Sequence, residues 1–244
     1  MGTAMRTWIP NQHGAWAMLI TPVLSGALIS GTTGWHLLLL LAWLAAYCLS
    51  FFAGLAVKSR KPARYRRQLL AYGAATAVLG LPLAVHAPGL LLLVPAAMGA
   101  FAVNVAFILR RNERAWVNDA VGILLGACVG LGAVLVGDRP HIDRHALLAI
   151  VMVALYFLGT VVYVKTLIRE RHSLPWRRVS FGLHAGYAMV CLLAQWWLAA
   201  IVAVGLVARA GLVPGRGWSP KRVGLTEILW TVLVALVALR GLPS

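Results

Sequence analysis

Long apolar stretches separated by short polar segments dominate the chain. Stretches such as LLLLLAWLAAY and LLLLVPAAMGAFAV do not alternate in polarity as strands of a membrane barrel do. A helix needs about 20 mainly apolar residues to cross the hydrocarbon core of a bilayer. The pattern therefore predicts nine membrane-spanning helices, over residues 14–33, 36–57, 69–86, 88–109, 118–137, 145–167, 179–195, 197–213 and 225–241.

These spans predict an all-α fold, a polytopic transmembrane helical bundle that forms a single domain over residues 1–244. The composition agrees, because 61% of the residues are hydrophobic and only 11% are charged. A soluble domain carries about twice that charged fraction. The first span is interpreted as a helix that stays in the mature protein rather than a cleaved signal peptide, because NQHGAW interrupts the apolar core that a signal needs.

The distribution of basic residues predicts the orientation in a bacterial inner membrane. With the N-terminus inside, all of the 22 Lys and Arg residues except Arg139, Arg144 and Arg240 lie on the cytoplasmic side. The positive-inside rule therefore favours N-in, C-out. The net charge of +16 is attributed to lipid anchoring. No nucleic-acid partner is expected, since no binding module has room to fold.

Polar side chains at the cytoplasmic ends of the spans are the candidate binding residues, because polar groups at membrane depth are costly. Asn11, Gln12 and His13 come first, at the mouth of the first span. A helix cap accounts for Asn11. It does not account for the two residues after it, so a functional role for this group is favoured.

A second group surrounds the connection between the fourth and fifth spans. Asn104 lies inside the fourth span, and a spacing of seven residues places Arg111 on the same helical face. Asn118 and Asp119 open the fifth span, where an acid complements the helix dipole. Capping explains Asp119, and an interhelical hydrogen bond explains Asn104. Donors at both helix ends also suit an anion site.

A third group lies at the end of the sixth span. Lys165, Arg169 and His172 follow at i, i+4 and i+7 and are expected on one face, with Glu170 beside them. Lys165 alone is explained by extension of its side chain to the interface. The whole stripe favours an anion pocket below an apolar groove.

His184 and Lys221 complete the candidate binding residues. A lone histidine such as His184 is more often an interhelical hydrogen-bonding residue, and Glu227 is expected to neutralise Lys221 or Arg222. The chain has six acidic residues and no D-x-x-D pair. No metal site and no cofactor are therefore predicted, and Mg²⁺ is an alternative with few carboxylates to support it.

The motifs WIPNQHGAWAMLITP, VNDAVG and YVKTLIRERHS resemble the YwiC-like family of bacterial membrane proteins over essentially the whole chain. The layout also resembles, more distantly, the UbiA-type intramembrane prenyltransferases. That resemblance implies a UbiA-like arrangement of nine helices with a cytoplasm-facing site and an apolar tunnel. The aspartate-rich motifs by which those enzymes hold Mg²⁺ and a prenyl diphosphate are missing here.

Three functions remain open after this comparison. The first is an intramembrane transferase or binding protein for an isoprenoid or other phosphate-bearing lipid, with membrane lipid or an isoprenoid diphosphate as partner. The second is a non-catalytic lipid-binding or assembly protein, which the missing aspartates favour. The third is a transporter for a small anion or metabolite. In all three the candidate residues are expected around one cytoplasm-facing cavity, and an anion there is expected to bind through cations rather than through a metal.

Overall fold

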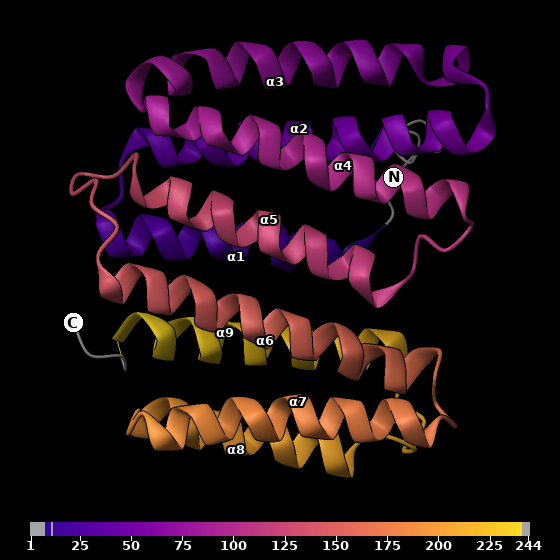
Figure 1. Ribbon diagram of the computed structural model, residues 1–244, viewed down its shortest axis with the longest axis vertical. Coiled ribbons are helices and arrows are strands. Elements are labelled where there is room, and N and C mark those ends of the chain that lie inside the picture. Colours follow the sequence, from indigo (N-terminus) through magenta and orange to yellow (C-terminus); the bar gives the residue numbers. More distant parts are fainter. Residues whose placement is uncertain (1–7, 11, 241–244) are drawn as a thin grey trace. The chain divides into compact units, whose positions relative to one another are not determined.

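The computed structural model describes residues 8–10 and 12–240, with the exception of the His13 side chain. This part of the chain consists of helices joined by short connections and contains no strand (Figure 1). The α-helices are α1 (His13–Ser30), α2 (Gly34–Ser59), α3 (Arg66–His86), α4 (Leu93–Leu109), α5 (Trp116–Val134), α6 (Arg144–Ile168), α7 (Leu174–Leu193), α8 (Trp197–Leu212) and α9 (Pro220–Arg240). The 3-10 helices η2 (Pro62–Tyr65) and η3 (Pro88–Leu92) precede α3 and α4. The predicted all-α fold with about nine helices is confirmed.

Within the described residues, six segments are long and apolar enough to cross a membrane. They are α2, η2 with α3 (Pro62–His86), η3 with α4 (Pro88–Leu109), α5, α6 and α9. Gly14–Ser30 of α1 and Trp197–Leu212 of α8 are apolar but shorter. The protein is therefore a membrane protein, and a count of nine spans requires that the shorter helices and α7 also cross.

Helices α7 and α9 begin five residues earlier than the hydropathy pattern predicts. Each has a proline in its first turn, Pro175 in α7 and Pro220 in α9. Proline suits the first helical positions because its fixed φ matches the helix and its missing N–H has no partner there. The first turns carry basic residues, so hydropathy alone places these starts too late.

In the part of the chain that the structure describes, three non-glycine residues with positive φ follow the end of a helix. Arg60 follows α2 with φ 54°, Arg111 follows α4 with φ 55°, and Gln195 follows α7 with φ 59°. The left-handed conformation stops helix propagation. Gln195 therefore separates α7 from α8 at the point where the hydropathy pattern nearly fuses the two spans.

Internal contacts divide the chain into two compact units, residues 1–141 and residues 142–244, and each is described separately. In unit 1, α1 packs on α2 and α5, α2 packs on α3 and α4, and α4 packs on α5. In unit 2, α7 packs on α6 and α8, and α9 packs on the same two helices. Unit 2 is therefore a four-helix ring. The expectation of a single domain stays a prediction.

Small residues bring α1 and α5 close together in unit 1. A Cβ atom added to Gly26 would lie 2.6 Å from the Cβ atom of Ala133, nearer than two carbon atoms can pack. The Ser30 hydroxyl at the end of α1 is also buried and donates to the Gly26 carbonyl at 2.9 Å. Small residues at helix interfaces allow such close approach in membrane proteins.

His36 joins the start of α2 to α5. Its Nδ1 accepts the backbone N–H of Thr33 at 3.0 Å, and its Nε2 lies 2.9 Å from the Ala133 carbonyl oxygen. A carbonyl only accepts, so the proton of this buried imidazole is on Nε2. The Thr33 hydroxyl adds a bond to the Val136 carbonyl at 2.9 Å. His36 and Thr33 therefore pair with these backbone carbonyls as neutral groups.

Candidate functional site

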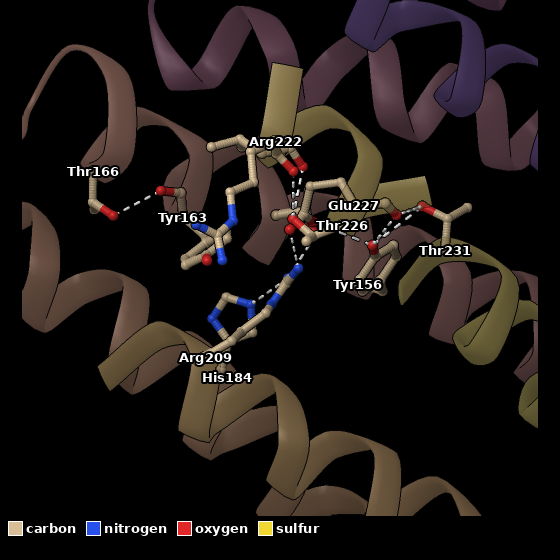
Figure 2. A network of polar contacts seen from close by, with 11 residues as sticks. Tyr156, Tyr163, Thr166, His184, Arg209, Arg222, Thr226, Glu227 and Thr231 are labelled. Atoms are coloured by element: carbon tan, nitrogen blue, oxygen red, sulfur yellow. Dashed lines mark hydrogen bonds and ion pairs between the residues drawn. The ribbon is translucent and has the colours of Figure 1, made fainter. Parts of the chain in front are cut away.

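All four helices of unit 2 contribute side chains to one largely buried cluster, the Arg209 network (Figure 2). Its members are Tyr156, Thr160 and Tyr163 of α6, His184 of α7, Arg209 of α8, and Glu227, Trp230 and Thr231 of α9. The arginine is only 6% exposed. A charged group inside a membrane-protein core is costly and is by default a candidate functional residue.

The Arg209 guanidinium uses both terminal nitrogens. One of them, Nη1, forms an ion pair with the Glu227 carboxylate. The other, Nη2, lies 3.1 Å from the Thr160 hydroxyl and 3.3 Å from Nε2 of His184. Arginine only donates, so Nε2 of His184 is the acceptor, and its Nδ1 donates to the Ser180 carbonyl at 2.7 Å. The histidine is thereby held as the neutral Nδ1–H tautomer.

Three aromatic rings surround the same guanidinium. Its central carbon lies 4.4 Å from the ring centroid of Tyr163, 5.6 Å from that of Trp230 and 5.7 Å from that of Tyr156. The negative faces of aromatic rings attract cations, more strongly where water is excluded. The rings therefore help to keep a positive charge in the core of unit 2.

The carboxylate of Glu227 also contacts α6. The Tyr156 hydroxyl lies 3.4 Å from Oε2 of Glu227 and 3.2 Å from the Thr231 hydroxyl. Thr231 in turn donates to the Glu227 backbone carbonyl at 2.7 Å. The carboxylate thus has a cation on one side and a hydroxyl donor on the other, which stabilises its charged form.

Two buried polar atoms beside this network have no hydrogen-bond partner among the described residues. They are Nε of Arg209 and the hydroxyl oxygen of Ser180, whose residue is 0% exposed. A buried donor left without a partner costs about 1–3 kcal/mol. The protein itself therefore leaves part of the hydrogen-bonding capacity of this region unused.

An open groove of about 320 Å³ lies between α7 and α8 near their basic ends. Arg177 and Arg178 line it on one side, and the remaining lining is mainly apolar. The other lining residues are Phe181, Gly182, Ala210, Gly211 and Pro214. A groove with guanidinium groups above an apolar surface has the character of a binding site for an amphiphilic anion.

In unit 1, the second predicted group is partly brought together. The side-chain amide of Asn104 donates to the Asn118 side chain at 3.3 Å, and Asn118 donates to the Glu113 carbonyl at 2.8 Å. The Lys58 ammonium lies 2.6 Å from the Glu113 carboxylate. This hydrogen bond holds the pKa of that carboxyl below its usual value. The ends of α2, α4 and α5 are joined by these contacts.

Two geometric predictions for this group are wrong. Helix α4 ends at Leu109, so the exposed Arg111, with its positive φ, does not continue the helical face of Asn104. Helix α5 begins at Trp116 after the N-cap residue Ala115, so Asp119 does not cap it but lies in its first turn, where an acid complements the helix dipole as predicted. A spacing of seven residues defines a face only while the helix continues.

The first predicted group is described in part. The Tyr47 hydroxyl donates to the Gln12 side-chain oxygen at 3.0 Å, which joins the start of α1 to α2. Gln12 is the residue before α1, and its side chain makes no capping hydrogen bond. Asn11 and the side chain of His13 lie outside the described residues.

The family model described as "YwiC-like protein" matches residues 9–134, more than half of the chain. A Bacillus subtilis (strain 168) protein, YwiC, is 33% identical over 227 residues, which cover 92% of this chain and 94% of that protein. A Haemophilus influenzae (strain ATCC 51907 / DSM 11121 / KW20 / Rd) protein is 30% identical over 236 residues, covering 96% and 98%. The chain belongs to the YwiC-like family. No solved structure matches this YwiC-like chain.

The sequence-predicted stripe at the end of α6 does not form in this YwiC-like protein. Helix α6 ends at Ile168, so Arg169 is the residue after it and His172 lies beyond the helix. Both are exposed. Lys165 instead lies over the Trp176 ring of α7, with its ammonium 5.9 Å from the ring centroid. The helix ends four residues before His172, so it cannot present the three side chains on a single face.

The remaining candidates of unit 2 have separate outcomes. His184 lies in the Arg209 network, where its hydrogen bond to Arg209 agrees with the interpretation of His184 as an interhelical hydrogen-bonding residue. Lys221 is exposed in the first turn of α9, and Glu170 is half-buried after α6. The expected pairing of Glu227 with a basic residue of its own helix is wrong, because its ion pair is with Arg209. A cavity shared by residues of both units stays a prediction.

Arg209 is the residue that sequence reasoning missed. The positive-inside count treats it as a cytoplasmic loop charge, whereas it is buried inside α8. A signal was present, because VGLVARAGLV places this arginine alone within an apolar stretch. Among the described residues there is no group of three or more His, Cys, Asp or Glu side chains that could hold a metal ion. Metal independence stays a prediction.

Proposed function

We propose that this YwiC-like protein binds a phosphate-bearing lipid at the groove between α7 and α8. The observation that carries the proposal is the pair Arg177 and Arg178 beside the apolar surface of Phe181 and Gly211. Guanidinium groups match the geometry of phosphate oxygens, and apolar surface suits an acyl or isoprenoid chain. Gly211 lies against Phe181, because an added Cβ atom would be 3.6 Å from its ring, an ordinary van der Waals distance.

The proposed membrane is the bacterial inner membrane, with the N-terminus inside and the C-terminus outside. Arg209 is buried and no longer counts as a loop charge, but the other basic residues still lie predominantly on the predicted cytoplasmic side. If all nine α-helices cross, the end of α8 and the start of α7 face the cytoplasm, together with the groove. Cysteine labelling tests this orientation. A cysteine at Arg64 is expected to resist an impermeant reagent in intact cells, and one at Gly34 to react.

The binding test uses purified protein in nanodiscs and farnesyl phosphate, farnesyl diphosphate and farnesol as ligands. The two phosphates are expected to bind and farnesol to bind much more weakly, with and without EDTA. R177Q/R178Q should lower the affinity at least tenfold, because a hydrogen bond to a charged group contributes about 1.5–3 kcal/mol. R66Q/R67Q is the matched control, since it removes two adjacent exposed arginines at the start of α3.

Three results would count against the proposal in different ways. Equal affinity for farnesol would remove the role of the phosphate. Equal losses in both double variants would indicate a general effect of surface charge. Loss of binding with EDTA would show that a metal is required, and the metal-free form of the proposal would then be wrong.

A further inference from the structure

The Arg209–Glu227 pair needs an explanation beyond stability. Removing two charges from water costs more than their attraction returns unless the geometry is excellent, and apolar pairs often replace buried ion pairs without loss. Here the pair is buried among helices, yet one guanidinium donor, Nε, has no partner among the described residues. An arrangement that is costly and incompletely satisfied is more consistent with a binding role than with packing.

The charge balance of the network is simple. One cation, Arg209, faces one carboxylate, Glu227. The titratable groups that face this pair are Tyr156 and Tyr163 from α6 and His184 from α7, and α9 contributes the carboxylate itself. His184 accepts from Arg209, so it is neutral in this arrangement. A second anion brought to Arg209 would therefore be left without a compensating charge.

Residues next to this network in sequence line the groove. Ala210 and Gly211, the two residues after Arg209 in α8, line it, and so does Phe181 of α7. Ser180, the residue before that phenylalanine, has the second buried polar atom without a partner. The unused hydrogen-bonding groups thus belong to residues adjacent in sequence to the groove lining.

We propose that Glu227 is a resident counter-anion that a phosphate group replaces on Arg209, with the uptake of one proton. When the phosphate binds, the ion pair opens and a proton from water adds to a carboxylate oxygen of Glu227. Arg209 then faces the phosphate in place of the Glu227 carboxylate, and the added proton removes one of the three negative charges that a dianionic phosphate and Glu227 would otherwise bring to this single cation. The protonated carboxyl remains within reach of the Tyr156 hydroxyl. This inference rests on the proposed function and adds a proton-coupled step to it.

The test measures farnesyl phosphate binding to the full-length protein in nanodiscs at several pH values. The measurements are made above about pH 7, where the phosphate is already doubly ionised because its second pKa is about 6. Uptake of one proton makes the dissociation constant of the wild-type protein rise about tenfold per pH unit. Calorimetry in buffers of different ionisation enthalpy gives the number of protons taken up, which should be one.

Variants of the pair separate the steps. E227Q removes the competing charge, so it should bind more tightly, with no proton uptake and no pH slope. R209Q/E227Q removes both charges together, which avoids leaving either one unpaired, and should lose at least tenfold in affinity relative to E227Q. R66Q/R67Q again serves as the control and should keep the wild-type slope.

The outcomes also distinguish this inference from the proposed function. If R177Q/R178Q weakens binding but E227Q keeps the wild-type pH slope, the lipid site stands and the exchange is overturned. If proton uptake persists in E227Q, another group takes the proton and the assignment to Glu227 is wrong. If wild-type protein binds neither farnesyl phosphate nor the diphosphate, both proposals fail together.

Discussion

Two buried histidines show how differently the two units treat polarity. In unit 1, His36 is 5% exposed and connects backbone groups of Thr33 and Ala133. In unit 2, His184 is 3% exposed and accepts from a charged group, Arg209. The two rings hold their protons on opposite nitrogens because their partners differ, a carbonyl at Nε2 in one case and an arginine in the other.

The comparison separates polar groups that fasten helices from polar groups that hold charge. Around His36 the partners are backbone groups and the Thr33 hydroxyl, each bond is neutral, and the result is a joined α2 and α5. Around His184 an ion pair, three aromatic rings and an unused donor lie together. The neutral hydrogen bonds around His36 are explained by the joining of two helices, whereas helix packing does not explain the buried charge of Arg209. This difference favours unit 2 as the location of the functional site.

The largest expected effect comes from breaking the charge pair of unit 2. Arg209→Met leaves the Glu227 carboxylate buried without its partner, which should destabilise the protein by about 3–5 kcal/mol. R209M/E227L should recover most of this loss, because a buried ion pair is often replaced by apolar side chains without cost. Thermal unfolding in detergent checks both variants, with Arg240→Met, at the exposed end of α9, as the control. A stable R209M would contradict the burial of the pair.

A smaller loss is expected from the corresponding change in unit 1. His36→Leu removes two hydrogen bonds without leaving a charge, at about 1–3 kcal/mol for each group that stays buried and unpaired. The same unfolding assay applies. His86→Leu is the control, because the His86 ring is exposed and stacks on Trp35 at 4.0 Å, so its loss leaves no buried polar group. If H36L costs as much as R209M, the distinction between neutral and charged polarity is wrong.

Helix packing in unit 1 gives a third test, in which two glycine-to-alanine substitutions are expected to change the stability in opposite directions. Gly26→Ala forces α1 and α5 apart, because the new methyl group would lie 2.6 Å from Ala133, and should cost about 1–3 kcal/mol. Gly122→Ala in α5 meets no atom within 4 Å. That change should stabilise the protein by about 0.4–1 kcal/mol, since alanine restricts the unfolded chain. Equal effects at both positions would indicate that α1 and α5 are not in close contact.

The smallest effect is expected from the exposed ion pair of unit 1. The Lys58 hydrogen bond lowers the pKa of Glu113 in the folded protein, so the carboxylate is favoured by folding. Its contribution is present above the ordinary glutamate pKa and is lost as the pH falls through the lowered value. Unfolding temperatures of wild-type protein and E113Q should therefore converge in acid, and high salt should reduce their small difference at neutral pH. If the difference in unfolding temperature between wild-type protein and E113Q grew in acid, the Lys58–Glu113 pair would not stabilise the fold as predicted.

Helices and membrane association were accessible from the sequence because both are properties of continuous segments. The residues of the Asn104–Asn118 contact were also within reach, since a short connection joins their helices. Helix ends were less accessible. The stripe of Lys165, Arg169 and His172 depended on a helix that stops at Ile168, and hydropathy does not record where a chain leaves the helical conformation.

The sequence alone was enough to predict a helical membrane protein with most of its basic residues at one set of helix ends. Length, hydropathy and charge act locally, so they can be summed along the chain. Tertiary structure alone decided that Arg209 pairs with Glu227, that His184 accepts from that arginine, and that α7 and α8 leave a groove. Those contacts depend on which faces of four helices turn toward one another, and interhelical packing sets that arrangement.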